Sequence, residues 1–186
     1  MKRVKHRIFL LIGAVGILAA MVVTWQYRTE KQMINRFVDD VMIQRGRLAL
    51  SLLGMQSDFF ESLTHDYTFW DEMVDFIREP DFDWAIDNIR NIIDAYEGNA
   101  VWVFDTTGKM VYGAADPDRG DIVHYPLIDS VVRQTLLRDR TIHRYIRTSA
   151  GLIDLHGATV HPTSDPDHET TPLGFFFTGK LIDSLF

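Results

Sequence analysis

The sequence predicts an α+β fold, in which a long amino-terminal helix precedes a five-stranded antiparallel sheet with short helices on one face. Two observations support this prediction. Apolar residues recur from Ile34 to Leu63 at a mean step close to the ~3.6 residues of a helix turn. From Ala100 onward the period changes to about two, and turn residues separate the apolar runs, which is typical of strand hairpins. Hairpins with helices gathered between them indicate an antiparallel sheet.

The amino-terminal end has the pattern of a membrane anchor. Residues 1–7 contain four Lys or Arg and form a predicted cytoplasmic segment, because positive charge is retained on the cytoplasmic side. The next 18 residues, Ile8–Trp25, carry no charge, which is near the lower limit for crossing a bilayer. We therefore predict a transmembrane helix over residues 8–25 that contacts the lipid bilayer. A cleaved signal peptide is the alternative, but Ala19-Ala20 is a poor match to a cleavage site.

A long helix is predicted over residues 26–64, where no proline interrupts the pattern. Such a helix is roughly 55 Å long, which exceeds what one small domain can cover. We expect it to serve in signalling and to form a homodimer, while a bent helix packed wholly on its own domain is the alternative. The apolar face consists of Ile34, Phe37, Val41, Leu48, Leu52, Met55, Phe59 and Leu63.

The remaining elements follow from changes of period. Two short helices are expected around Trp70–Ile77, ending at Pro80, and around Ile86–Tyr96, ending at Gly98. A third, weaker helix is expected over Tyr125–Leu137. The five predicted strands are Ala100–Asp105, Met110–Ala114, Thr141–Thr148, Leu152–His161 and Leu173–Ile182. This order fits a PAS-like domain over residues 65–182, with residues 183–186 as the start of a return segment.

Composition excludes several classes of function. The formal net charge is -7, and four of the 19 basic residues precede the apolar span, so the rest of the chain is strongly acidic. Nucleic-acid binding requires a basic surface, and none is expected. The absence of cysteine excludes disulfides, thiol catalysis and thiolate metal sites.

A family resemblance rests on two segments. Asp66–Phe76 reads DYTFWDEMVDF and is followed by Pro80, Trp84 and Asn88, and Val101–Gly113 reads VWVFDTTGKMVYG. Together they resemble the fourth class of CHASE domains, the cyclase/histidine-kinase-associated sensory extracellular modules. Thr68 departs from the family pattern, in which alanine is usual at that position.

The resemblance implies a bacterial extracytoplasmic ligand sensor with a PAS/Cache-like fold, held in the inner membrane with its carboxyl-terminal domain in the periplasm. Such modules are coupled to a cytoplasmic diguanylate cyclase, cyclic di-GMP phosphodiesterase or histidine kinase. We expect this chain to be part of such a receptor, with a small-molecule ligand as partner. A membrane-anchored structural or assembly protein is the main alternative, and a periplasmic hydrolase is a second.

Four neighbouring residues are candidate ligand contacts: Asp66, Tyr67, Trp70 and Asp71. Their helical spacing lets aromatic and carboxylate groups share a face, which suits a small cationic or polar ligand. The alternative is structural, with a carboxylate capping the helix start and Trp70 filling the core.

A second set of candidates is expected to line a cavity between the sheet and the helices: Trp84, Asn88, Trp102 and Tyr112. Ligand pockets are mostly aromatic with a few polar groups. Ordinary core packing is the alternative for the three aromatic residues, whereas Asn88 requires a polar partner if it is buried.

Other polar residues receive structural interpretations. Asp105 begins the turn between the first two strands and is expected to bond its own backbone. The segment from His143 to Arg147 is interpreted as a surface strand, although a buried Arg144 with an anionic partner is the alternative. His161, Asp165, Asp167 and His168 lack a recognised ligand spacing. The sequence therefore predicts no metal, cofactor or catalytic residue, and no enzymatic activity.

The predicted topology leads to a first testable prediction. A reporter enzyme that is active only after export, fused after Phe186, should be active in bacteria, because the basic residues 1–7 hold the amino terminus in the cytoplasm. Activity of a cytoplasm-specific reporter fused at the same position would contradict the predicted orientation.

Overall fold

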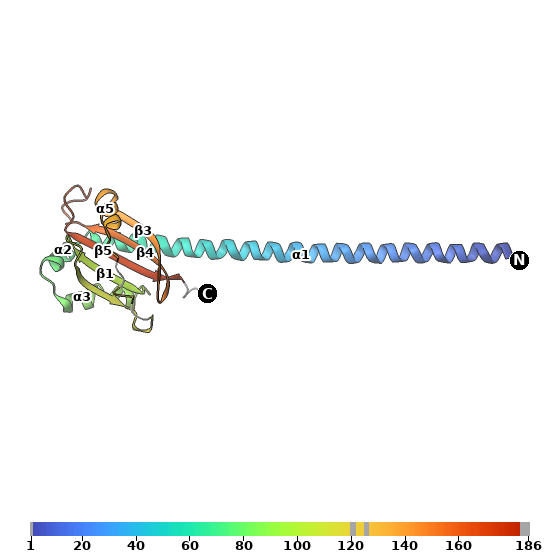
Figure 1. The fold of residues 1–186 in the computed structure, drawn as a ribbon, viewed down its shortest axis with the longest axis horizontal. Coiled ribbons are helices and arrows are strands. Elements are labelled where there is room, and N and C mark those ends of the chain that lie inside the picture. The colour runs from blue at the N-terminus through green and yellow to red at the C-terminus, as the bar shows by residue number, and fades with distance from the viewer. Residues whose placement is uncertain (1, 120–121, 125–126, 183–186) are drawn as a thin grey trace. The chain divides into compact units, whose positions relative to one another are not determined.

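The computed structural model describes the backbone of residues 2–119, 122–124 and 127–182. It describes no side chains for residues 1–15, 19–20, 29–30 and 32–39. The chain divides into two units, Met1–Leu52 and Leu53–Phe186. The described residues of the first unit, from Lys2 on, are helical, and the second unit contains the sheet (Figure 1).

One helix, α1 (Lys2–Thr68), runs through the first unit and into the second. The long helix predicted over residues 26–64 is thus present. Among the residues whose side chains are described, no helical segment combines the length and hydrophobicity needed to cross a membrane. The predicted span at residues 8–25 falls largely outside those residues and stays a prediction.

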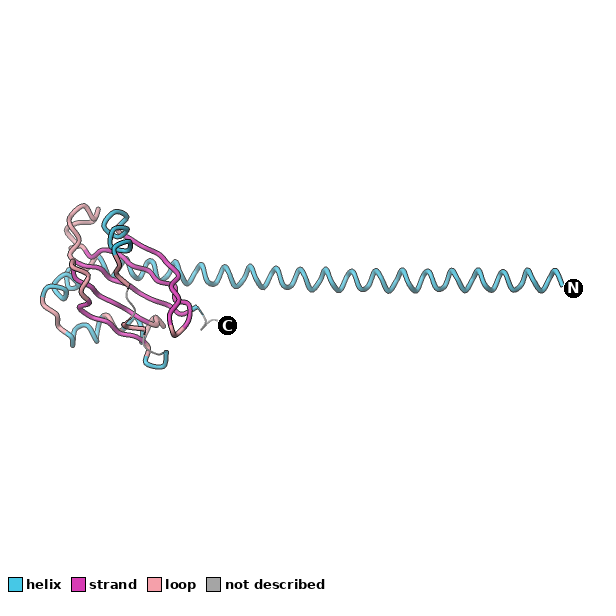
Figure 2. The backbone as a smooth tube through the Cα atoms, in the orientation of Figure 1, coloured by secondary structure: helices cyan, strands magenta, loops and turns pink. Residues whose placement is uncertain are grey.

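The second unit is built on a five-stranded antiparallel sheet in the order β2-β1-β5-β4-β3, which confirms the predicted fold class (Figure 2). Chain neighbours β1 and β2 form one hairpin, β3 and β4 form another, and β5 pairs between them. The strands are β1 (Ala100–Asp105), β2 (Met110–Ala115), β3 (Thr141–Thr148), β4 (Gly151–Val160) and β5 (Gly174–Leu181).

The first hairpin turns where the sequence indicated. The Asp105 carboxylate accepts hydrogen bonds from the backbone N–H groups of Thr107 at 2.8 Å and Lys109 at 3.0 Å. Gly108 has a φ of 87°, a conformation that costs glycine little and other residues more. The structural interpretation of Asp105 is confirmed.

Helices cover both faces of the sheet, so the prediction that they lie on one face is wrong. One core cluster joins α1, α2 (Asp71–Arg78), α3 (Phe82–Asn88) and α4 (Asn91–Asp94) to Val101, Val103 and Phe176. The other joins α5 (Ser130–Asp139) and the segment before it to alternate residues of the same strands. Because successive strand residues point to opposite faces, covering both faces buries nearly the whole of β1, β4 and β5.

The helix expected around Ile86–Tyr96 is two shorter helices, α3 and α4. The Asp81 carboxylate caps the start of α3 by accepting from the N–H groups of Asp83 at 3.1 Å and Trp84 at 3.2 Å. The break between α3 and α4 lets Ile89 and Ile92 both reach the core, where each is fully buried. The burial of both isoleucines in the core therefore breaks the single helix that the apolar spacing predicted.

The helix expected over Tyr125–Leu137 begins later, at Ser130. The Asp129 carboxylate accepts from the N–H of Val132 at 2.7 Å, so Asp129 is the amino-terminal cap. Arg140 ends α5 in the left-handed conformation with a φ of 68°.

The last turns of α1 belong to the core of the second unit. Phe60 and Leu63 are buried in the core cluster that also contains residues of α2 and the sheet. The Thr64 hydroxyl donates to the Phe60 carbonyl at 2.7 Å and lies 2.6 Å from the Thr178 hydroxyl of β5. Since the proton of Thr64 is engaged, Thr178 is the donor in this second bond. The end of α1 is thus fixed to the central strand by apolar and polar contacts.

Candidate functional site

Five aromatic side chains gather where the end of α1 meets α2, α3 and β2. The Trp84 ring lies 5.4 Å from that of Trp70 and 5.3 Å from that of Phe76, measured between centroids. Tyr67 stands edge-on to Trp70 at 5.7 Å, and Tyr112 stands edge-on to Phe76 at 6.1 Å. The fold thus brings four of the predicted site residues together, along with Phe76, which the sequence analysis did not single out.

Asn88 lies beside this aromatic cluster but is engaged with the protein itself. Its side-chain amide donates to the Trp84 carbonyl at 2.9 Å, and its backbone carbonyl accepts from the Tyr67 hydroxyl at 3.1 Å. Burial raises the pKa of Tyr67, and the nearby Tyr96 raises it further. The Tyr67 hydroxyl therefore stays protonated at neutral pH and ties the end of α1 to α3.

An open groove of about 540 Å³ lies against the cluster, between α2 and the start of α3. Phe76 and Trp84 supply its aromatic wall. Its other lining residues are one cation and four acidic residues: Arg78, Glu72, Asp75, Glu79 and Asp81. Arg78 pairs with Asp75 at 3.9 Å, but both side chains are exposed, so this ion pair neutralises the groove weakly. The groove therefore has an acidic rim and an aromatic wall.

Asp71 and Asp66 lie outside this groove. The Asp71 carboxylate accepts from the backbone N–H of Thr163 at 2.9 Å and also from the Thr163 hydroxyl. Both bonds lower the pKa of Asp71 below its ordinary value, and the bond from the Thr163 hydroxyl has the larger effect. Asp71 thus holds the loop after β4 against the start of α2. Asp66 is an exposed residue near the end of α1.

Trp102 does not share a cavity with the other candidates, and that prediction is wrong. It is fully buried in the cluster on the α5 face, where its indole N–H donates to the Val123 carbonyl at 2.9 Å. Trp102 pairs with Gly113, whereas Tyr112 pairs with Val103. A difference of one residue in register places a side chain on the other face of the sheet. Tyr112 accordingly packs against the cluster on the α1 face.

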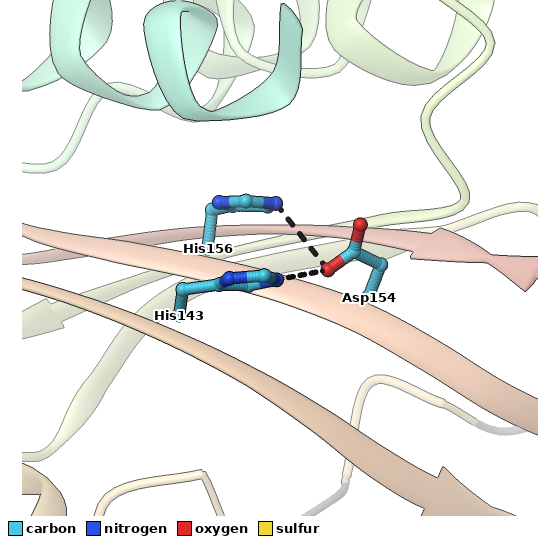
Figure 3. Close-up of side chains that lie close together, drawn as sticks. All are labelled: His143, Asp154 and His156. Carbon is cyan, nitrogen blue, oxygen red and sulfur yellow. Dashed lines mark hydrogen bonds and ion pairs between the residues drawn. The ribbon is translucent and has the colours of Figure 1, made fainter. Parts of the chain in front are cut away.

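Apart from the aromatic cluster, a cluster of polar side chains lies on the β3–β4 hairpin, beneath α1 (Figure 3). Asp154 Oδ1 is 2.6 Å from His143 Nε2 and 3.4 Å from His156 Nε2. The two imidazole rings are stacked with centroids 4.4 Å apart and planes 7° from parallel. His156 Nε2 also lies 3.1 Å from the hydroxyl of Ser57 on α1. Burial acts to raise the pKa of Asp154, but hydrogen bonds from His156 and His143 outweigh it, so the pKa is lowered.

The sequence analysis missed this polar cluster, although its signal is local. The turn pairs Thr148 with Gly151, and the antiparallel register then places His143 opposite His156. Tyr145 is opposite Asp154 in the same way. Alternating polar residues on both arms of a predicted hairpin, counted outward from the turn, would have indicated the cluster. Among the described residues it is the group of His and acidic side chains whose spacing suits a metal ion.

The loop after β4 is organised by one carboxylate. Asp165 accepts from the backbone N–H groups of Glu169 and Thr170, each at 3.0 Å, and from His161 Nδ1 at 3.0 Å. These bonds and that of the Thr170 hydroxyl, which acts most strongly, hold the pKa of Asp165 well below its ordinary range. Burial lowers the pKa of His161, whose ring stacks on His168 with centroids 4.6 Å apart. This arrangement stabilises the loop, in agreement with its structural interpretation.

Comparison with known proteins identifies the family. Residues 52–186 match the CHASE4 domain family. The chain belongs to that family. CHASE4 domains are sensory extracellular modules, so the second unit is a sensor domain of a signalling receptor. No curated protein matches the chain.

Among solved structures, the Escherichia coli DcuS sensor domain is similar, at 12% sequence identity and a TM-score of 0.49. The match covers 70% of this chain and 95% of the DcuS chain.

The contacts of Asp71 lead to a second prediction. Replacing Asp71 by Ala should lower the melting temperature at neutral pH, because the Thr163 N–H and hydroxyl lose their acceptor. The folded-state pKa of Asp71 is depressed, so its stabilisation is present above the ordinary value of 3.8 and declines as the pH falls below it. The melting temperatures of the two proteins should therefore converge in acid, which calorimetry at several pH values measures.

The matched control is Glu72→Ala, which removes an acidic side chain from the same first helical turn. It should leave the melting temperature nearly unchanged. An equal loss in both variants would assign the effect to the helix dipole rather than to the bonds with Thr163.

Proposed function

We propose that this CHASE4 domain is the periplasmic ligand-sensing part of a bacterial inner-membrane receptor, anchored through residues 8–25. Membership of the family over residues 52–186 supports the sensory role. The basic residues 1–7 ahead of the apolar segment support the orientation. In this proposal the chain is not itself an enzyme. The receptor's output is a diguanylate cyclase, a cyclic di-GMP phosphodiesterase or a histidine kinase, as the domain family implies.

The groove between α2 and α3 is the proposed ligand site, and its composition indicates a small organic cation. Four acidic residues and one Arg line it, so a positive ligand is favoured over a negative one. The half-buried Trp84 presents aromatic surface in the same groove, which the buried Phe76 also borders, and aromatic faces attract ammonium groups. The acidic rim and aromatic wall together are the observation that supports this ligand class.

A ligand in the groove is linked to the end of α1 through direct contacts. Trp84 contacts Trp70, and Trp70 contacts Tyr67 on the last turn of α1. A ligand that moves Trp84 therefore acts on the end of α1 through two aromatic contacts. Such binding biases the receptor only if the two positions of α1 differ in ligand affinity.

A charge-matched pair of variants tests the ligand site. Polyamines, choline and basic amino acids should raise the melting temperature of the full chain in detergent, and an organic acid such as succinate should not. Glu79→Gln should weaken binding of the stabilising ligand about two- to fivefold, because it removes one of the four exposed carboxylates. Asp83→Asn removes a charge from α3 outside the groove lining and should leave the affinity unchanged.

The results distinguish the alternatives. Equal weakening in both variants would indicate a general effect of charge and not a site in the groove. Stabilisation by none of the cations would contradict the proposed ligand class and favour the structural or assembly role.

We also propose that the receptor is a homodimer formed through α1. One face of α1 carries Leu48, Leu52 and Met55, and these residues are 62%, 54% and 67% exposed. Exposed apolar residues in such a stripe are typical of a helix–helix interface. Leu50 is 70% exposed but points to the opposite side of the helix, which provides an internal control.

The dimer proposal gives a further prediction. Leu52→Glu should shift the full chain in detergent toward the monomer, because it places a charge inside the apolar stripe. Leu50→Glu should leave the association unchanged. Analytical ultracentrifugation measures both, and a monomeric wild-type chain would contradict the proposal.

A further inference from the structure

The His143–Asp154–His156 cluster has the composition and spacing of a metal site. One potential ligand atom from each residue lies within 4.8 Å of the others. Both Nε2 atoms are directed at the same carboxylate oxygen, Asp154 Oδ1, at 2.6 Å and 3.4 Å (Figure 3). Two imidazoles and a carboxylate are a ligand set that zinc adopts in proteins, with one further position left for water.

The observed separations agree with tetrahedral coordination. Bonds of about 2.0–2.1 Å from a central zinc ion place its ligand atoms roughly 3.3 Å from one another. The contact between His156 and Asp154, at 3.4 Å, already has this length. The contact between His143 and Asp154, at 2.6 Å, has to lengthen, and the parallel rings have to tilt toward the ion. The side chain of His143 is 43% exposed, so it has room for this movement.

We propose that His143, Asp154 and His156 bind a divalent transition-metal ion, with zinc as the expected occupant. This metal site is separate from the proposed cation groove, and the two share no residue. Imidazole ligands favour zinc, copper and nickel over magnesium and calcium, which take oxygen ligands. The strands fix the three ligands because His143 and His156 are direct partners across β3 and β4.

The surroundings provide both shielding and access. The side chains of His156 and Asp154 are only 4% and 9% exposed, so two ligands are held in the protein while His143 faces solvent. A small pocket of about 80 Å³ borders both histidines and is also lined by Glu61 and Thr64 of α1. Asp154 does not line this pocket, so an ion reaches the three ligands from the solvent-exposed side of His143.

Metal binding at this place acts on α1. The Ser57 hydroxyl of α1 is already 3.1 Å from His156 Nε2, the atom that coordinates the ion. When His156 Nε2 binds the ion, it uses its lone pair for the metal and can no longer hydrogen-bond to the Ser57 hydroxyl. The ion thus replaces the contact of His156 with α1, where Ser57 also hydrogen-bonds to Asp154. The metal is a second input to the same helix that the aromatic cluster contacts.

The alternative role for this cluster is a hydrogen-bonded brace without metal. The experiment uses the full chain in detergent, without a histidine tag and after chelator treatment. Isothermal titration with Zn²⁺ should show one ion bound per chain, and Co²⁺ should give the visible absorption of a four-coordinate site. Mg²⁺ and Ca²⁺ should not compete.

Substitutions separate the two roles. His143→Gln keeps a polar side chain at an accessible position and should weaken Zn²⁺ binding about 100-fold or more, since even outer-shell partners contribute 10- to 100-fold. His156→Gln should do the same, but it alters a buried residue, so His143→Gln is the deciding variant. His168→Gln, in the loop after β4, is the matched control and should bind Zn²⁺ as the wild type does.

Two results would overturn the proposal. One is a chelator-treated wild-type chain that binds no Zn²⁺. The other is a His143→Gln variant that binds Zn²⁺ as tightly as wild type, which would place any bound ion elsewhere. The thermal response to organic cations in His143→Gln separates this site from the groove, because that response should be retained even though metal binding is lost.

Discussion

The structure depends on the burial of the end of α1 within the sensor domain. Phe60 and Leu63 are core residues, and the Thr64 hydroxyl is bonded to Thr178 on the central strand. Leaving one of these buried hydroxyl groups without a partner would cost about 1–3 kcal/mol of stability. The hydrogen bond between them therefore fixes the position of α1 along the sheet. Because α1 cannot shift along β5 without breaking this bond, a movement of the sheet also displaces the end of α1.

Both candidate sites contact α1, at different turns. The aromatic cluster reaches it through Tyr67, which also donates a hydrogen bond to α3. The histidine cluster reaches it through Ser57. Between these two contacts lies the Thr64–Thr178 bond. This arrangement allows two ligands to bias one helix, provided that each binds more tightly to one of its positions.

The sheet face beneath α1 is divided between apolar and polar residues. Val103 and Phe176 belong to the same apolar core cluster as Phe60 and Leu63, whereas the polar part consists of Asp154, His156, Thr178 and Lys180. Among the described residues, no buried side-chain nitrogen or oxygen atom lacks a hydrogen-bond partner. Polar groups in a core lower its stability unless they are paired, and they are found where function requires them. The histidine cluster lies in this polar part.

The sequence by itself determined the long helix, the five strands and the turn between the first two strands. Apolar periods located the long helix and all five strands, and turn chemistry at Asp105 set the first hairpin. These features depend on residues close together in the chain. The tertiary structure alone decided that β5 inserts between β1 and β4, and that helices cover both faces. It thereby separated Trp102 from Tyr112 and placed Ser57 against His156. Tertiary contacts join residues up to 114 positions apart, as Thr64 and Thr178 are, and they follow from how buried faces fit together, which no local period encodes.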